Sequence, residues 1–140
     1  MTRFLRTAEA FFVLLFLFIG CWTAFSFFRG AYNTNDLMCG GNPVTEVPSN
    51  SIILLTGTIK NYSEISLGRL SVIADAYDGD GRLIGTGTFI SDPGVSLPPS
   101  YFLQYSVKIV VPSGYRNVKN FMLIPRSSFG TGKLQTVLLN

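Results

Sequence analysis

Hydrophobic residues follow two different patterns along this chain. Positions 11–28 form an apolar run of 18 residues without a charge, whereas the sequence from residue 51 onward has short apolar stretches separated by turn residues. At about 1.5 Å per residue, a helix over 11–28 would be roughly 27 Å long, close to the hydrocarbon thickness of a bilayer. The first pattern therefore predicts a transmembrane helix, and the second predicts β-structure.

The β-type segments are short, rich in β-branched residues and bounded by turns. Asp78-Gly79-Asp80-Gly81 separates two of them and predicts a hairpin. One face of the most regular segment carries Tyr101, Leu103, Tyr105, Val107, Ile109 and Val111. Strands are expected at 52–60, 70–77, 82–90, 101–111, 118–124 and 134–139. Six or more short strands with no helix predict a mainly β fold, an antiparallel β-sandwich with a single core.

These patterns divide the chain into four parts. They are a cytoplasmic N-terminus at 1–10, a transmembrane helix at 11–28, a linker at 29–50 and the β-sandwich domain at 51–140. The linker is assigned because glycine, proline and asparagine cluster within it and no periodicity is visible. Its length is large for a structureless connection, so part of it is also open to packing on the domain or on a partner.

Charge sets the orientation and excludes one class of partner. Arg3 and Arg6 precede the apolar run, which favours a cytoplasmic N-terminus and an exported C-terminal domain. After residue 29 the chain carries eight Lys and Arg against seven Asp and Glu, so it has no basic stripe for nucleic acid. We predict a single-pass membrane protein with its domain outside the cytoplasm.

Cys21 raises an alternative for the same segment. Phe18-Ile19-Gly20-Cys21 fits the loose form of a lipobox, which would make Cys21 the lipidated first residue of a lipoprotein. An uncleaved signal anchor is favoured because Trp22 to Phe28 continue the apolar run to bilayer length. Within that helix, Gly20 and Ala24 form a small-xxx-small pair that could allow close helix packing.

A third alternative is a pilin-like filament subunit. Glu9 lies beside the apolar run, as a glutamate does in type IV pilins. The segment Thr7-Ala8-Glu9-Ala10 lacks the glycine that pilin processing requires, which disfavours filament assembly.

Candidate chemistry in the domain is sparse. The chain has no histidine, which removes the commonest general base and metal ligand, so we expect no enzyme, no cofactor and no metal site. The aspartates at 75, 78 and 80 are interpreted as turn residues, because the spacing does not match a calcium loop. Gly85 and Gly87 are interpreted as a bulge or a close approach of a neighbouring strand. Asn61-Tyr62-Ser63 is a glycosylation sequon, but Asn61 is interpreted as the residue of a strand-ending turn. Cys39 is interpreted as a loop thiol, and an intermolecular disulfide through it is left open.

Three segments follow one another in the domain: Thr56-Gly57-Thr58-Ile59-Lys60-Asn61, then Ala76-Tyr77-Asp78-Gly79-Asp80-Gly81 with the residues that follow it, then Leu97-Pro98-Pro99-Ser100-Tyr101-Phe102. With these segments in this order, residues 51–124 resemble the FxLYD domain and, more distantly, the immunoglobulin-type fold of late-embryogenesis-abundant proteins. The resemblance implies an exported immunoglobulin-like β-sandwich, usually membrane-anchored, without established catalysis. The predicted function is an accessory subunit or interaction module of a membrane protein complex. Its expected partners are membrane lipid and other subunits, reached through the helix and exposed sheet edges, and no small-molecule ligand is expected.

Overall fold

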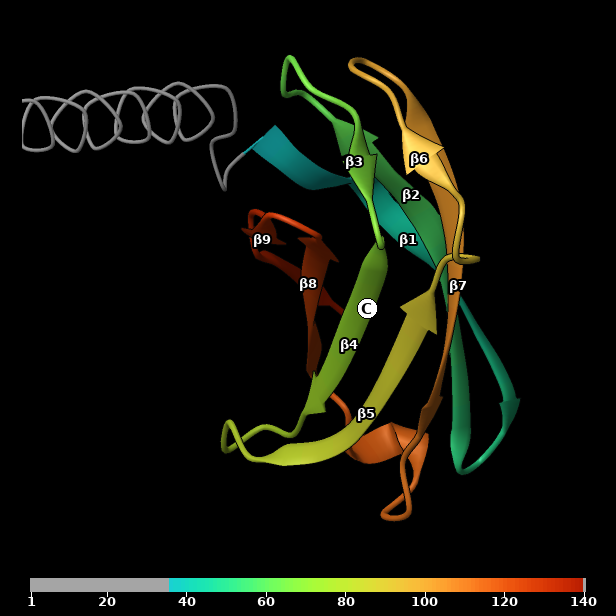
Figure 1. The fold of residues 1–140 in the computed structure, drawn as a ribbon. Coiled ribbons are helices and arrows are strands. Elements are labelled where there is room, and N and C mark those ends of the chain that lie inside the picture. The colour runs from blue at the N-terminus through green and yellow to red at the C-terminus, as the bar shows by residue number, and fades with distance from the viewer. Residues whose placement is uncertain (1–35, 140) are drawn as a thin grey trace, which may run out of the picture. The chain divides into compact units, whose positions relative to one another are not determined.

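The computed structural model of the protein describes residues 36–139, which form antiparallel β-strands and one short 3-10 helix (Figure 1). The longer strands are β1 (Leu37–Ser49), β2 (Ile52–Asn61), β4 (Ser71–Tyr77), β5 (Leu83–Ile90), β7 (Phe102–Val110), β8 (Asn120–Ser127) and β10 (Gln135–Leu138). Short strands β3 (Leu67–Gly68), β6 (Ser96–Leu97) and β9 (Gly130–Thr131) and the 3-10 helix η2 (Tyr115–Asn117) complete the described chain.

The mainly β prediction is confirmed, and each of the six expected strands is present within a few residues of its predicted bounds. β4 and β5 pair across the turn at Asp78–Gly81, which confirms the predicted hairpin. Alternation of buried and less buried residues is seen in β4, β7 and β8, whereas β5 has no fully buried residue.

The prediction of a linker over 29–50 is wrong for its second half. Leu37–Ser49 forms β1, which pairs with β2 along most of its length. The register shifts between Gly40 and Val44, so the glycines, asparagine and proline at 40–43 form an irregularity within the strand. The breakers that suggested a linker therefore mark a bulge inside a paired strand.

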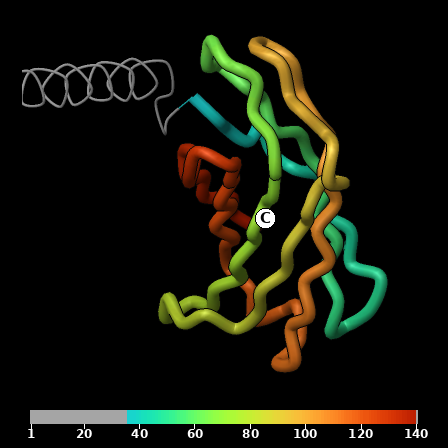
Figure 2. The backbone as a smooth tube through the Cα atoms, in the orientation of Figure 1, coloured from blue at the N-terminus to red at the C-terminus, as the bar shows by residue number. Residues whose placement is uncertain are grey.

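The larger strands form one curled antiparallel sheet in the order β1-β2-β7-β5-β4-β8-β10, with β9 paired to β8. Most neighbours pair extensively, but β7 and β5 share a single pair, Thr86 with Val110. That narrow joint is where the sheet bends, and the backbone trace in Figure 2 shows the two halves facing each other across the core.

Glycine makes this joint sterically possible. A Cβ at Gly87 would collide with the carbonyl oxygen of Lys108 in β7, and one at Gly85 would lie 2.7 Å from the carbonyl oxygen of Val110. The prediction that these glycines mark a close approach of a neighbouring strand is confirmed.

The two edges of the curled sheet also meet at one end. Lys133 N donates to Leu37 O at 2.8 Å, just before β10 begins. Gln135 Nε2 donates to Gly41 O at 2.6 Å, which adds a side-chain bond between β10 and the bulge of β1. The first part of β1 is therefore tied to both sides of the core, whereas the rest of β1 pairs with β2 only among the described strands.

The core fills the inside of the curl with inward-facing residues, most of them from β1, β2, β4, β7 and β8. Its largest fully buried side chains include Tyr105, Phe121, Leu37, Ile53, Leu55, Ile59, Ile109 and Leu123. The predicted alternation holds in β7 from Tyr105 to Ile109, but Tyr101 precedes the strand and is 65% exposed, so its assignment to the apolar face is wrong. Tyr101 belongs instead to the loop that leads into β7.

The predicted transmembrane helix at 11–28 lies outside the described residues. Within residues 36–139 we find no helix with the length and apolarity needed to cross a membrane.

We predict that Gly87→Ala destabilises the folded domain by about 3 kcal/mol or more, because the backbone of β7 has to move to admit a methyl group. Gly94→Ala is the matched control, since a Cβ there meets nothing within 4 Å. Thermal unfolding of the full chain in mild detergent measures both, and equal melting temperatures for the two variants would contradict the proposed crossing.

Candidate functional site

The aspartates of the β4–β5 turn make turn contacts. Asp78 Oδ1 accepts hydrogen bonds from Asp80 N and Arg82 N, each at 2.9 Å. Gly81 follows with a φ of 76°, a conformation that favours glycine. Asp75 lies in β4 and accepts from Thr86 Oγ1 at 2.7 Å. The interpretation as turn residues is confirmed for Asp78 and Asp80 and is wrong for Asp75, which lies within β4 and bonds across to β5.

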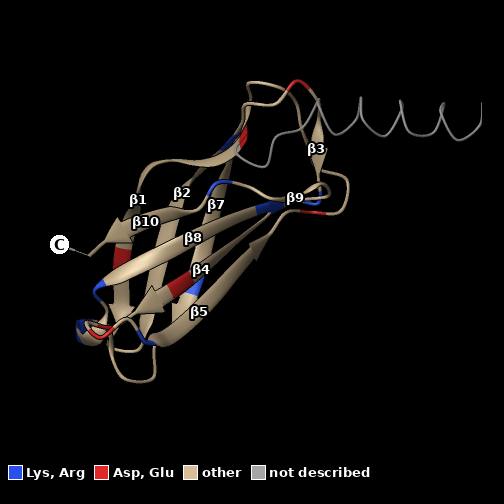
Figure 3. Cartoon of the chain, turned by 90° about the vertical axis from the view of Figure 1, so that its left-hand side faces the viewer, with Lys and Arg blue, Asp and Glu red and all other residues tan. Residues whose placement is uncertain are grey.

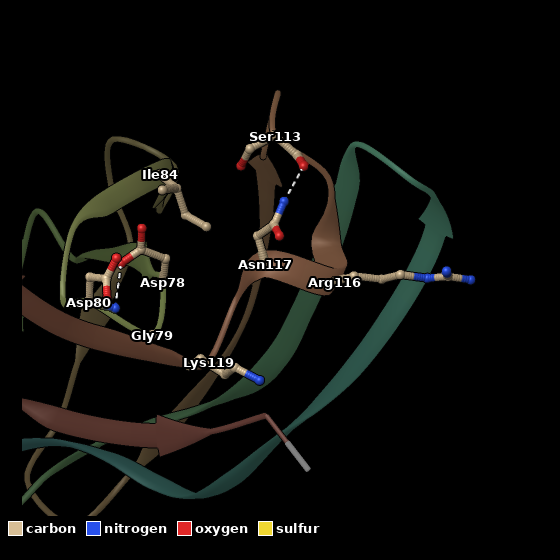
Figure 4. A pocket seen from close by; sticks show the side chains of 8 residues that line it. All are labelled: Asp78, Gly79, Asp80, Ile84, Ser113, Arg116, Asn117 and Lys119. Atoms are coloured by element: carbon tan, nitrogen blue, oxygen red, sulfur yellow. Dashed lines mark hydrogen bonds between the residues drawn. The ribbon is translucent and has the colours of Figure 1, made fainter.

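A hollow of about 430 Å³ lies beside this turn, between it and the η2 region (Figure 4). It is lined by Asp78, Gly79, Asp80, Ile84, Ser113, Arg116, Asn117 and Lys119. Charges of both signs gather at this end of the domain (Figure 3), but Arg116 points away from the two aspartates. Asp78 is occupied by the turn and Asn117 Nδ2 by the carbonyl of Ser113, so the hollow has no convergent set of free polar groups.

A second hollow, of about 720 Å³, lies at the other end of the domain among β3, β4, β5 and β6. Its lining includes Arg69, Ile90 and Ser91. Ser91 Oγ is buried without a hydrogen-bond partner in the described structure. One unpartnered hydroxyl does not define how a ligand would bind, so this hollow does not indicate a class of ligand.

Asn61 is the most highly connected polar side chain that the structure describes. Its Nδ2 donates to Ile65 O at 2.7 Å and to Leu97 O at 2.9 Å, and its Oδ1 accepts from Ser63 N at 2.9 Å and Ser63 Oγ at 2.6 Å. The side chain is fully buried. All of its hydrogen-bonding capacity is used to join the end of β2 to the following turn and to β6.

The backbone of Asn61 adds two further bonds. Asn61 N donates to Tyr101 O at 3.0 Å, and Ser100 N donates to Asn61 O at 2.8 Å. The interpretation of Asn61 as a strand-ending residue is confirmed, and the amide of the sequon is enclosed within the folded domain.

We predict that Asn61→Asp destabilises the domain by about 3 kcal/mol, because a carboxylate would face two carbonyl oxygens that now accept from the amide. Asn42→Asp introduces the same change at an exposed position and should have little effect. Denaturant unfolding of the full chain compares the two. A similar midpoint for both variants would show that the Asn61 network contributes little stability.

Cys39 lies on the inner face of β1 and is only 8% exposed, so its assignment to a loop is wrong. The Tyr105 hydroxyl hydrogen-bonds to its sulfur. The Tyr105 side chain extends from β7 across Gly57 of β2 to reach Cys39. A Cβ at Gly57 would lie 2.7 Å from the tyrosine oxygen, so the absence of a side chain there makes room for the contact. Since the sulfur is enclosed, the folded domain does not present it for an intermolecular disulfide.

Burial raises the pKa of the Cys39 thiol to about 12, and the hydrogen bond from Tyr105 offsets part of that rise. Burial also raises the pKa of the Tyr105 hydroxyl, and the neighbouring Cys39 adds to the increase. A thiol that remains protonated is a poor nucleophile, so this pair has the properties of a core contact.

The raised pKa predicts that stability falls at alkaline pH. The unfolded chain loses the Cys39 proton from about pH 9 while the folded domain keeps it to about pH 12, so the free energy of unfolding should decrease as pH rises through that window. Unfolding of the full chain at several pH values between 8 and 11 measures this slope. Cys39→Ala should have a shallower slope, and an unchanged one would contradict the assignment.

The remaining residues singled out from the sequence cannot be placed. Cys21, Gly20 and Ala24 lie outside the described residues. Sequence reasoning missed the exposed aromatic residues at Tyr62, Tyr101 and Phe102. These residues lie where β2 ends and where β7 begins. A pattern of alternation describes the inside of a strand and gives no information about residues at its ends.

No protein-family model and no curated protein matches the chain. Among solved structures, it is similar to a β-glucuronidase of glycoside hydrolase family 2, at 13% identity and a TM-score of 0.47, over 70% of this chain and 11% of that one. A glycosyl hydrolase family 2 member from Bacteroides cellulosilyticus DSM 14838 is similar at 10% identity and a TM-score of 0.49, over 76% of this chain and 15% of that one. The putative ApaA protein from Bordetella pertussis is similar at 17% identity and a TM-score of 0.40, over 75% and 89% of the two chains.

This chain spans a small fraction of the two hydrolases. The likeness is to a β domain within them and gives this chain neither a substrate nor a reaction.

Proposed function

We propose that this protein is a non-catalytic, single-pass membrane protein whose exported β domain is an accessory subunit or interaction module of a membrane complex. The observation that carries the proposal is the combination of a bilayer-length apolar run at 11–28 with a folded β domain that presents an open strand edge.

The open edge is the second part of β1. From Val44 to Ser49 this strand pairs with β2 on one side, and in the described sheet no strand covers its other side. Val44 is 63% exposed and Val47 is 40% exposed. Unpaired backbone groups beside exposed apolar side chains suit the addition of a strand from a partner. Pro48 limits how far such pairing can extend.

The family relationship remains part of the proposal. The proposal of an immunoglobulin-like sandwich of the FxLYD type is supported by two of the three segments that carry the resemblance, since the residues after Tyr77 form the β4–β5 turn and Asn61 ends β2.

Intact mass and co-purification test the proposal together. The full chain, purified in mild detergent from its own host, should have a mass of about 15.4 kDa and should bring partner subunits at constant stoichiometry. A chain that begins at Cys21 and carries acyl groups would replace the anchor with the lipoprotein alternative.

A paired set of variants tests the edge itself. Val44→Arg combined with Val47→Arg should release the partner, because two charges would lie along the pairing surface. Thr88→Arg is the control, an exposed position on β5, which is not an edge strand. Retention of the partner by the Val44 and Val47 double variant would rule out the β1 edge as the binding surface.

A further inference from the structure

Exposed aromatic residues are concentrated at one end of the domain. Four of the large hydrophobic side chains found exposed are aromatic: Tyr62 at 53%, Tyr101 at 65%, Phe102 at 66% and Phe129 at 48%. Tyr62 follows β2, Tyr101 precedes β7, Phe102 begins β7, and Phe129 lies in the β8–β9 turn. Three of the exposed aliphatic residues, Leu83, Val110 and Leu138, lie at the opposite end of their strands.

Three of these aromatic residues lie at neighbouring positions at the end of β2 and the start of β7, and we name them the aromatic tip: Tyr62, Tyr101 and Phe102. Phe102 lies directly opposite Lys60 in the β2–β7 register, and Tyr101 O accepts from the neighbouring Asn61 N. Lys60 Nζ lies 4.7 Å from the centroid of the Tyr62 ring. The loops that carry Tyr62 and Tyr101 stand together at the top of Figure 1.

The chain enters the domain at this same end. Tyr62 N donates to Asp36 O at 2.6 Å, so the first described residue lies against the aromatic tip. Seven residues, 29–35, separate Asp36 from the apolar run that ends at residue 28. Fully extended, seven residues reach at most about 25 Å.

That reach is shorter than the domain. The ten residues of β2 span about 33 Å from the tip to the opposite end. If the run at 11–28 spans the bilayer, the connecting residues hold the aromatic tip near its surface and keep the Leu83 end away from it.

The chemistry of the tip suits that location. Tyrosine and other amphipathic aromatic residues favour the headgroup region, where the ring leaves water and the hydroxyl stays hydrated. Lysine can extend its ammonium toward water while its alkyl stem covers apolar surface. Because the aromatic tip itself is uncharged and Lys60 is the cation that lies against it, apolar contact rather than attraction to anionic lipid should dominate.

We propose that the aromatic tip docks into the headgroup and upper acyl region of the bilayer, so that the domain stands on the membrane surface with its β1–β2 and β4–β5 turns directed away. This inference rests on the proposed membrane anchor. It adds an orientation, and it commits to lipid as the partner of this surface.

Tryptophan quenching by brominated lipid tests the docking. The only tryptophan of the chain is Trp22, inside the predicted span. In a Trp22→Phe background, Phe102→Trp places a reporter in the tip, and Leu83→Trp places one at the opposite end, where the native side chain is 56% exposed. Each full-length variant is reconstituted in nanodiscs of phosphatidylcholine with brominated or unmodified acyl chains.

We expect bromination to quench the Phe102→Trp variant at least twofold more than the Leu83→Trp variant. Tyr101→Trp should behave like Phe102→Trp, which guards against an artefact of one substitution. Equal, weak quenching of the tip and control variants would overturn the docking and redirect the aromatic tip toward a protein partner.

Quenching of Trp22 in the wild-type chain distinguishes rejection of the docking alone from rejection of the membrane anchor. Strong quenching of Trp22 with an unquenched tip leaves the anchor in place and rejects the docking alone. An unquenched Trp22 rejects the membrane-spanning segment, and the docking inference is rejected with it.

Discussion

The close crossing of β5 over β7 is the contact on which this domain depends. The two halves of the sheet share one residue pair there, and the strands approach so closely that neither Gly85 nor Gly87 has room for a side chain. Without that approach the β1-β2-β7 layer and the β5-β4-β8-β10 layer would not enclose Tyr105, Phe121 and the aliphatic residues between them. A sheet this size needs such a bend, because apolar side chains on one open face would remain in contact with water.

Sequence patterning predicted the strands whose side chains alternate and failed where the backbone is irregular. β4, β7 and β8 have one buried face each, so buried residues recur at every second position along them. β1 carries a bulge that interrupts the period and places glycine, asparagine and proline inside a paired strand. Its buried positions, Leu37, Cys39 and Pro43, are too few and too irregularly spaced to produce a pattern.

The polar contacts could be predicted only in part, and for a related reason. Asp78 and Asn61 follow local rules, since turn residues bond to backbone groups a few positions away. The bond between Cys39 and Tyr105 joins β1 and β7, which are separated in the chain by β2 through β6, and it needs the space left by Gly57. The aromatic tip likewise joins the end of one strand to the start of another, so it becomes visible only when the register of β2 and β7 is known.

The enclosure of Asn61 also has a consequence for the order of events during biogenesis. Glycan transfer requires a free asparagine amide, but in the folded domain this amide donates to Ile65 O and Leu97 O. Leu97 lies 36 residues further along the chain, so the amide stays reachable until β6 has emerged and closed over it. In a compartment that glycosylates nascent chains, folding and sugar transfer would compete for one nitrogen atom. A glycan at Asn61 would therefore mark chains in which these hydrogen bonds had not yet formed when the sugar was transferred.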